Sequence, residues 1–478
     1  MGVQSLTRKR RGAVVLPGAT AVLAVLLMAG PAYAQALPDT AALPDSAALE
    51  VRASERATSR RPVPAPDSAV LSLSDVYDAA RRGNPRLQAA AAAVDARRAM
   101  EASAGLPPDP TVQIGIMNFS VPGFSANMPT SMAPSIEAMQ MLPIGKLGLA
   151  GDIAEQATTI AAADAEEAWW AVRSAAAMSF YEIWEADRQV TVMRATLEWL
   201  QSFATVARAM YASGEGSQSD VLRAGVEVAR MEADIERMTA MRAAAAARLN
   251  AVLDRPADAP VPAPVYDPLP LDLPVPDTLR TWAERHRPML DAGRTGLEQA
   301  RTRMRLARRE IWPDLAVGVQ YGQRRAAGSE MAEGGTERMG SVMLGFSVPV
   351  FARQRQLRMR EEANAMERMA AAELGGMRAQ VDARIAELLA TLDRARTLVQ
   401  LYRTQVLPQA AATVESAMSS YRVGRVDFMT LVDAQMTRNE FEQELVALLA
   451  EYGTAAAELE MTIGRELPRN GPLLAEAR

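Results

Sequence analysis

The sequence contains no cysteine, a single histidine (His286) and only two lysines (Lys9 and Lys146). The lack of cysteine excludes disulfides, thiolate zinc sites and cysteine nucleophiles, and a Ser-His-Asp triad would have to use His286. The net charge is -5 at pH 7, so the chain lacks the basic surface that nucleic-acid binding requires. We therefore expect no enzyme activity, no cofactor, no resident metal site and no nucleic-acid partner.

Aromatic residues are also scarce, at 5% of the 478 residues, whereas 49% are hydrophobic and alanine is abundant. Alanine has the highest helix propensity and lets helices approach closely, so this composition favours long, closely packed helices over a conventional globular core. The length alone allows about two to four ordinary domains.

Residues 1–34 have the pattern of a signal peptide. A cationic start at Arg8 to Arg11 precedes an apolar run from Ala13 to Gly30, and Ala32-Tyr33-Ala34 is a small-residue cleavage pattern before Gln35. The alternatives are a retained membrane anchor and, from Arg10-Arg11, a twin-arginine signal. Because no later segment reaches the ~18 apolar residues of a spanning helix, we expect a periplasmic, secreted or outer-membrane β protein.

Two proline-rich tracts divide the rest of the chain. Residues 35–70 are rich in Ala, Pro and Asp and predict a disordered tail, and residues 255–277 predict an extended linker. The segments on either side, 71–254 and 278–467, share landmarks in the same order. Asn84-Pro85 matches Arg287-Pro288, and the YASG motif ending at Gly214 matches the YRVG motif ending at Gly424. This order indicates two structural repeats, followed by a C-terminal tail at 468–478.

Each repeat predicts the same series of elements. A first helix (Leu73 to Gly105; Leu279 to Ile311) leads into a hairpin, at about 110–143 and 313–351. A helical stretch of about 65 residues, a glycine turn and a helix of about 35 residues follow. The hairpin strands alternate, with Val317, Val319 and Tyr321 on one face and Gly318, Gln320 and Gly322 on the other.

Alternation of this kind is typical of transmembrane β-strands, and equally of an ordinary half-buried hairpin. Four strands cannot close a barrel around a pore, and open edges are not tolerated in lipid. If these strands span a membrane, several subunits must share one barrel, and three is the natural number. A helix of about 65 residues would measure ~100 Å at 1.5 Å per residue, which suits a protein that reaches across the periplasm.

From about residue 71 to 467 the chain resembles the outer-membrane efflux protein (TolC-like) family. The resemblance rests on the duplicated plan and on a series of short motifs in order: Asn84-Pro85, Pro143-Ile144-Gly145-Lys146, Arg287-Pro288, Trp312-Pro313-Asp314-Leu315, Tyr402-Arg403, Leu407-Pro408-Gln409-Ala410 and the paired YxxG turns. It implies a mainly α fold with a small β part, built from a duplicated helix–β-hairpin–long-helix unit. Three copies would form an α-barrel tunnel with coiled-coil helices and share a twelve-stranded transmembrane β-barrel.

The resemblance also implies a function. Members are exit ducts in the outer membrane with a long periplasmic extension, and they join a periplasmic adaptor protein and an inner-membrane pump, here of the RND type. The helical tips that meet the adaptor would be Gly214, Gly216, Val423 and Gly424. A tight turn also needs glycine for a positive φ angle, which is the alternative reason for these residues.

The family pattern further assigns a periplasmic gate. Asp220 and Tyr421 correspond to a pair that holds the entrance closed, and Asp433 to a carboxylate of an acidic ring that would attract cations. The alternative for Asp433 is a solvated helix carboxylate. Two positions depart from the pattern: Thr430 stands where a second gating Asp is expected, and Val426 where some members have an Arg.

The hairpins are rich in methionine, including Met117, Met128, Met139, Met331 and Met343. The stretch from Pro110 to Lys146 resembles the heavy-metal branch of the family, and thioethers suit soft ions such as Cu(I). Methionine is also a flexible apolar filler, so we assign no metal ligand. We expect heavy-metal cation efflux, with drug or general small-molecule export as the alternative. A soluble periplasmic coiled-coil scaffold or adaptor and an enzyme are the competing classes.

Overall fold

The computed structural model describes residues 70–117, 132–267, 269–270, 272–325, 336–423, 425–468 and 473–474. The chain divides into two units, and all described elements belong to the second, Val63–Arg478. The predicted signal peptide and nearly all of the predicted N-terminal tail lie outside the described residues. So do Met128, Met331 and Gly424.

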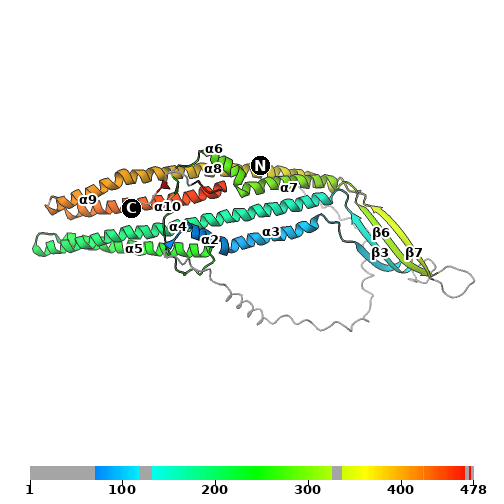
Figure 1. Cartoon of the computed structure of the whole chain (residues 1–478), viewed down its shortest axis with the longest axis horizontal. Helices are drawn as coiled ribbons and strands as arrows, with labels where there is room; N and C mark the ends of the chain where they lie inside the picture. Colours follow the sequence, from blue (N-terminus) through cyan, green and yellow to red (C-terminus); the bar gives the residue numbers. More distant parts are fainter. Residues whose placement is uncertain are drawn as a thin grey trace, which may run out of the picture. The chain divides into compact units, whose positions relative to one another are not determined.

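The first half of the second unit contains helices on both sides of a hairpin (Figure 1). Its elements are α2 (Leu73–Gly83), α3 (Pro85–Ala104), β2 (Thr111–Met117), β3 (Met132–Leu142), α4 (Leu147–Ser213) and α5 (Gln218–Val252). The second half follows the same plan with α6 (Pro276–His286), α7 (Pro288–Arg309), β6 (Leu315–Arg325), β7 (Thr336–Phe346), α8 (Gln356–Leu401), a π-helical turn η1 (Tyr402–Val406), α9 (Leu407–Arg422) and α10 (Phe428–Ile463). Two-residue strands β1 (Val70–Leu71), β4 (Ala263–Pro264), β5 (Leu269–Pro270) and β8 (Leu473–Leu474) pair as β1 with β4 and β5 with β8.

Three predicted helices are interrupted. The first helix of each half breaks before a proline, because the ring forces the preceding residue out of the helical region: Asn84 has ψ 121° and Arg287 has ψ 117°. At the first break the side chain of Asn84 caps α3, because its oxygen accepts a hydrogen bond from the Arg86 N–H. The amide nitrogen of the same side chain donates to the Val252 carbonyl at 2.7 Å and so connects this break to the end of α5. The long helix of the second half is interrupted at η1, next to Pro408, a residue that cannot donate the usual backbone hydrogen bond.

The hairpins join into one antiparallel sheet in the order β2-β3-β6-β7. Residues that pair across the four strands form rows, and neighbouring rows lie on opposite faces of the sheet. Val112, Ala138, Val319 and Val342 form one row, and the neighbouring row on the other face is Gln113, Glu137, Gln320 and Ser341. Val112, Val319 and Val342 are exposed. The sheet therefore presents an uncovered apolar face. β7 ends at Phe346, so Val348 and Val350, which lie within the hairpin predicted at about 313–351, are beyond the strand.

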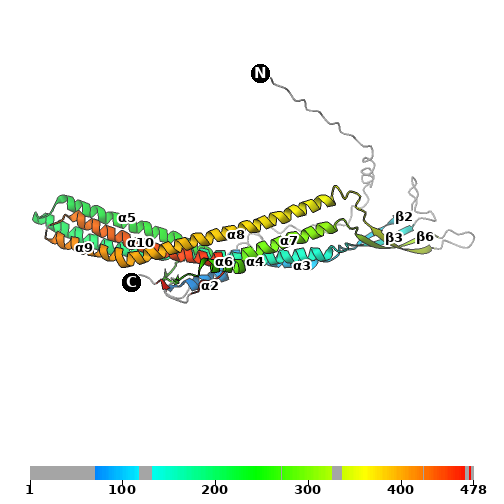
Figure 2. The same ribbon diagram turned by 90° about the horizontal axis from the view of Figure 1, so that it is seen from above.

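Within this unit the sheet and the two helical turns lie at opposite ends (Figures 1 and 2). The turn between α4 and α5 and the turn between α9 and α10 occupy the same end in both views. The 67 residues of α4 span ~100 Å at 1.5 Å per residue. Not one helix in the described part of the chain combines the length and the hydropathy needed to cross a membrane.

The main core lies where α4, α8 and α10 meet, beside the linker that carries Tyr266. Tyr181 packs against the backbone of Gly453, where a Cβ would approach the ring to 2.5 Å. At the edge of the core, the buried Arg173 pairs with Glu460 at 2.8 Å and with Glu466 at 2.5 Å. Burial raises the pKa of Glu460 in spite of this pairing, because the carboxylate loses its hydration.

Candidate functional site

The turn after α4 is built by two glycines. Gly214 ends the helix with φ 79°, a value that glycine adopts without steric cost, and its N–H donates to the Tyr211 carbonyl at 3.1 Å. Gly216 donates to the Met210 carbonyl at 2.9 Å, and a Cβ there would lie 2.9 Å from the Tyr211 nitrogen. Backbone geometry therefore requires both glycines, whatever protein contacts this turn.

The matching turn follows α9 and leads into α10. Val423 is exposed and caps α9, and Asp427 caps α10 by accepting the Thr430 N–H at 3.0 Å and the Thr430 hydroxyl at 2.5 Å. These bonds, with the nearby charge of Arg223, lower the pKa of Asp427. Thr430, predicted in the gate, is thus engaged in helix capping.

The two turns are tied together by Tyr421. Its hydroxyl donates to the Met210 sulfur at 3.3 Å, and its ring centroid lies 6.3 Å from that of Phe203 and 6.2 Å from that of Phe428. Burial raises the pKa of Tyr421, and the negative charge of Asp220 raises it further. The hydroxyl of Tyr421 therefore bonds to Met210, and Asp220, its predicted partner, acts on Tyr421 through its charge.

Behind the turns lies a separate apolar cluster from α4, α5 and α10. Its buried members are Met193, Leu200, Ala204, Ala207, Ala224, Met231, Phe428 and Val432. Trp199 and Phe203 stack against this cluster with centroids 4.2 Å apart, and Tyr421 packs on its edge. The turns are thus anchored on packed side chains.

Asp433 is exposed on α10. Within the described residues it forms no ion pair, so a gating role would depend on other copies of the chain.

Sequence reasoning missed Met210, Asp427 and Phe428. The role of Asp427 could have been predicted from the sequence, because an Asp three residues before Thr430 is a helix N-cap pattern. No sequence pattern predicts the role of Met210, because it meets Tyr421 only through the packing of helices from different repeats.

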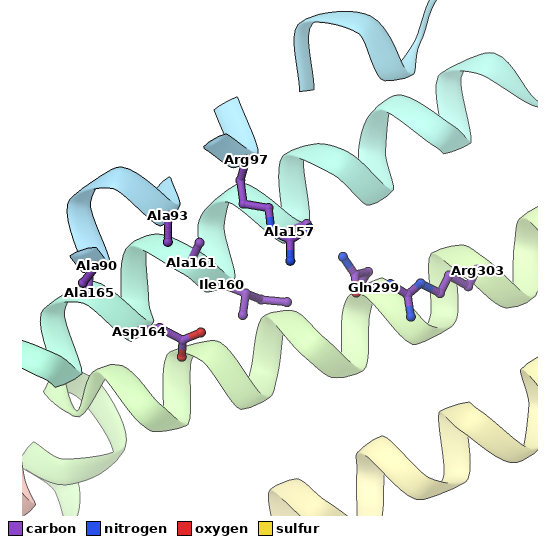
Figure 3. A pocket seen from close by; sticks show the side chains of 10 residues that line it. All are labelled: Ala90, Ala93, Arg97, Ala157, Ile160, Ala161, Asp164, Ala165, Gln299 and Arg303. Atoms are coloured by element: carbon purple, nitrogen blue, oxygen red, sulfur yellow. The ribbon is translucent and has the colours of Figure 1, made fainter. Parts of the chain in front are cut away.

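A cavity of about 350 Å³ lies between α3, α4 and α7 (Figure 3). Alanines such as Ala90, Ala157 and Ala161 form much of its wall. Gln299 in its lining donates to the Ile153 carbonyl at 2.9 Å and so connects α7 to α4. We interpret this space as a groove left between the packed helices α3, α4 and α7. Within the described ranges, no group of three or more acidic or histidine side chains is arranged to hold a metal ion.

Comparison with known proteins identifies the family. A family model described as outer membrane efflux protein matches residues 76–255 and 280–465. The chain belongs to this family. The family and its fold are those of outer-membrane efflux channels and not of enzymes, which confirms the predicted family, class and location. The competing soluble scaffold is not supported.

Individual relatives agree with this assignment. The cobalt-zinc-cadmium resistance protein CzcC of Cupriavidus metallidurans is 23% identical over 421 residues, which cover 87% of this chain and 95% of CzcC. A membrane protein from Pseudomonas aeruginosa has a similar fold with a TM-score of 0.70, 20% identity and coverage of 82% of this chain and 93% of that one. CusC has a TM-score of 0.70 at 15% identity, with coverage of 85% and 96%.

Proposed function

We propose that this efflux channel is the exit duct of a tripartite system that exports heavy-metal cations. The observation that carries the cargo assignment is the match to CzcC along 95% of the length of that metal-resistance protein. The duct would pass ions from the periplasm to the exterior, in contact with a periplasmic adaptor and an inner-membrane pump of the RND type. A family channel supplies a path and no chemical step, so no cofactor is required.

The sheet supports a trimer. Strands β2 and β7 each pair on one side only within the described residues, which leaves two open edges beside an exposed apolar face. Unpaired backbone groups are costly in lipid, and four strands are too few for a pore. Three copies would close the edges into a twelve-stranded barrel. An SDS-resistant trimer in outer-membrane fractions is expected, and a monomer in the soluble periplasmic fraction would contradict it.

We assign the entrance to the helical tips. Gly214, Gly216, Val423 and Gly424 would present the turns to the adaptor. Tyr421 and Asp220 would set how closely the two turns are held, beside the capping residue Thr430. Asp433 from three copies would form an acidic ring that attracts cations.

The division of the chain into domains stays as the sequence predicts it. Its parts are a signal peptide (1–34), a tail (35–70), two repeats (71–254 and 278–467) joined by a linker (255–277), and a C-terminal tail (468–478).

The cargo is tested by growth of a deletion strain and its complemented parent. The panel contains cobalt, zinc, cadmium, nickel, copper, silver and several unrelated drugs. We expect selective sensitivity to divalent metals that a plasmid copy reverses. Sensitivity to drugs with unchanged metal tolerance would instead make this a multidrug or general export duct.

A further inference from the structure

The end of the second hairpin presents an apolar and aromatic surface beside the helices. The Asp314 N–H donates to the Ser347 hydroxyl at 2.9 Å and the Ser347 N–H donates to the Asp314 carbonyl at 3.0 Å, so the ends of β6 and β7 lie together. Just beyond them, Trp312 is 61% exposed and Phe351 is 71% exposed. Val348 and Val350 beside Phe351 are also exposed, so the apolar face of the strands continues to this point.

Arginines flank this surface along the chain. Arg308 and Arg309 end α7, and Arg353 and Arg355 precede α8; all four are exposed. The Arg309 guanidinium lies 5.8 Å from the centroid of the Trp312 ring. None of these four arginines forms an ion pair with any described acidic side chain. We call Arg308, Arg309, Trp312, Arg353 and Arg355 the basic rim.

The first hairpin has no such feature at the same end. Its cation, Lys146, is buried and pairs with Glu310 at 3.2 Å and Asp314 at 2.8 Å. These contacts connect the two hairpins and leave Lys146 unavailable to a ligand. Of the two hairpin ends next to the helices, only the second therefore carries exposed arginines among the described residues, in a chain whose net charge is -5.

Aromatic side chains next to cations, at the limit of an apolar β face, fit the boundary between hydrocarbon and headgroups. Arginine pairs well with phosphate oxygens, and basic clusters at this depth are attracted to anionic leaflets. We propose that the basic rim binds anionic phospholipid headgroups of the leaflet that faces the helices. The inference rests on the proposed function, because it requires the strands to cross the membrane. The bound headgroups would set the depth of the barrel and favour anionic lipid around each second hairpin.

The test measures lipid selectivity by electron spin resonance. The full-length protein is reconstituted into phosphatidylcholine vesicles with spin-labelled phosphatidylglycerol or spin-labelled phosphatidylcholine as probe. We expect phosphatidylglycerol to associate about threefold or more tightly at low salt, with the preference weakened at high salt by screening. The variant Arg309→Gln/Arg353→Gln/Arg355→Gln should show a ratio near one. Arg194→Gln/Arg230→Gln/Arg237→Gln, on α4 and α5, removes the same charge elsewhere and should keep the wild-type ratio.

The outcomes separate the two proposals. Failure of the wild-type protein to float with the vesicles would contradict the membrane-spanning barrel itself. Normal insertion and conductance with equal association of both lipids would overturn only the lipid proposal. Equal loss of lipid selectivity in the rim variant and the control variant would also overturn only the lipid proposal, because net charge alone would then explain the preference. If the glutamine variant does not assemble, Arg309→Lys/Arg353→Lys/Arg355→Lys keeps the charge and should retain most of the selectivity.

Discussion

The hydroxyl of Tyr421 donates a hydrogen bond to the sulfur of Met210, 3.3 Å away, and so connects the end of α9 to the end of α4. These helices belong to different halves of the chain, and the contact lies where the two turns meet. The bond is a candidate latch, because separating the turns would break it while the ring contacts with Phe203 and Phe428 also loosen.

Loss of the Tyr421 hydroxyl should favour the open entrance. Tyr421→Phe keeps the ring packing and removes one hydrogen bond, worth about 1 kcal/mol, which corresponds to up to about a fivefold shift between closed and open forms. We expect higher single-channel conductance in planar bilayers. Met210→Leu should have the same effect, since it removes the acceptor. Unchanged conductance in both variants would mean that this contact does not hold the entrance.

The turn after α4 should not tolerate a side chain at Gly216. A Cβ there would lie 2.9 Å from the Tyr211 nitrogen, so Gly216→Ala should cost about 1–3 kcal/mol and reduce adaptor capture. Gly225→Ala on α5 is the matched control. Its Cβ meets nothing within 4 Å, and alanine should stabilise the helix by about 1 kcal/mol. Thermal melting followed by circular dichroism would compare them, and equal melting temperatures would contradict the prediction.

Glu185 should make stability depend on pH. Burial raises its pKa, and the charge of Glu182 raises it further, although Gln189 donates a hydrogen bond to it at 2.8 Å. A carboxyl whose pKa is higher in the folded state stabilises the fold below its ordinary pKa and loses this contribution as the pH rises.

The corresponding experiment uses Glu185→Gln, which cannot ionise. We expect a higher melting temperature than wild type at pH 7 and little difference near pH 4. Glu198→Gln, at an exposed position of α4, should follow the wild-type curve at both pH values. A Glu185→Gln variant that is less stable than wild type at pH 7 would show that the carboxylate is favourable when charged.

The buried pair Arg173–Glu460 predicts a large effect from a single truncation. Arg173→Ala would leave the Glu460 carboxylate buried without its partner, at a cost of about 3–5 kcal/mol. Because burial already raises the pKa of Glu460, this loss should be greatest above neutral pH. Glu466→Gln removes only the exposed partner and should cost less than about 1 kcal/mol. Trimer yield and melting temperature would measure both.

Patterns of neighbouring residues predicted the helical segments well and their interruptions poorly. The glycine after α4 and the alternation in β6 follow from local sterics and the two-residue period of a strand, so they could be read directly. The breaks at Asn84 and Arg287 were missed, although each precedes a proline. The second hairpin was predicted to extend to about residue 351, but β7 ends at Phe346, which pairs with Leu315 at the start of β6; this register is not visible in the sequence.

By itself the sequence determined the class of protein: an exported, mainly helical chain without catalytic groups, in the family of outer-membrane efflux channels. Composition and periodicity, which are local or additive along the chain, indicate the long helices, whereas the family follows from the resemblance of the motifs in their order. Only the tertiary structure decided that Tyr421 meets Met210, and that Lys146 is buried between Glu310 and Asp314. Such contacts join residues far apart in the chain, and they arise from the register in which long helices and strands pack.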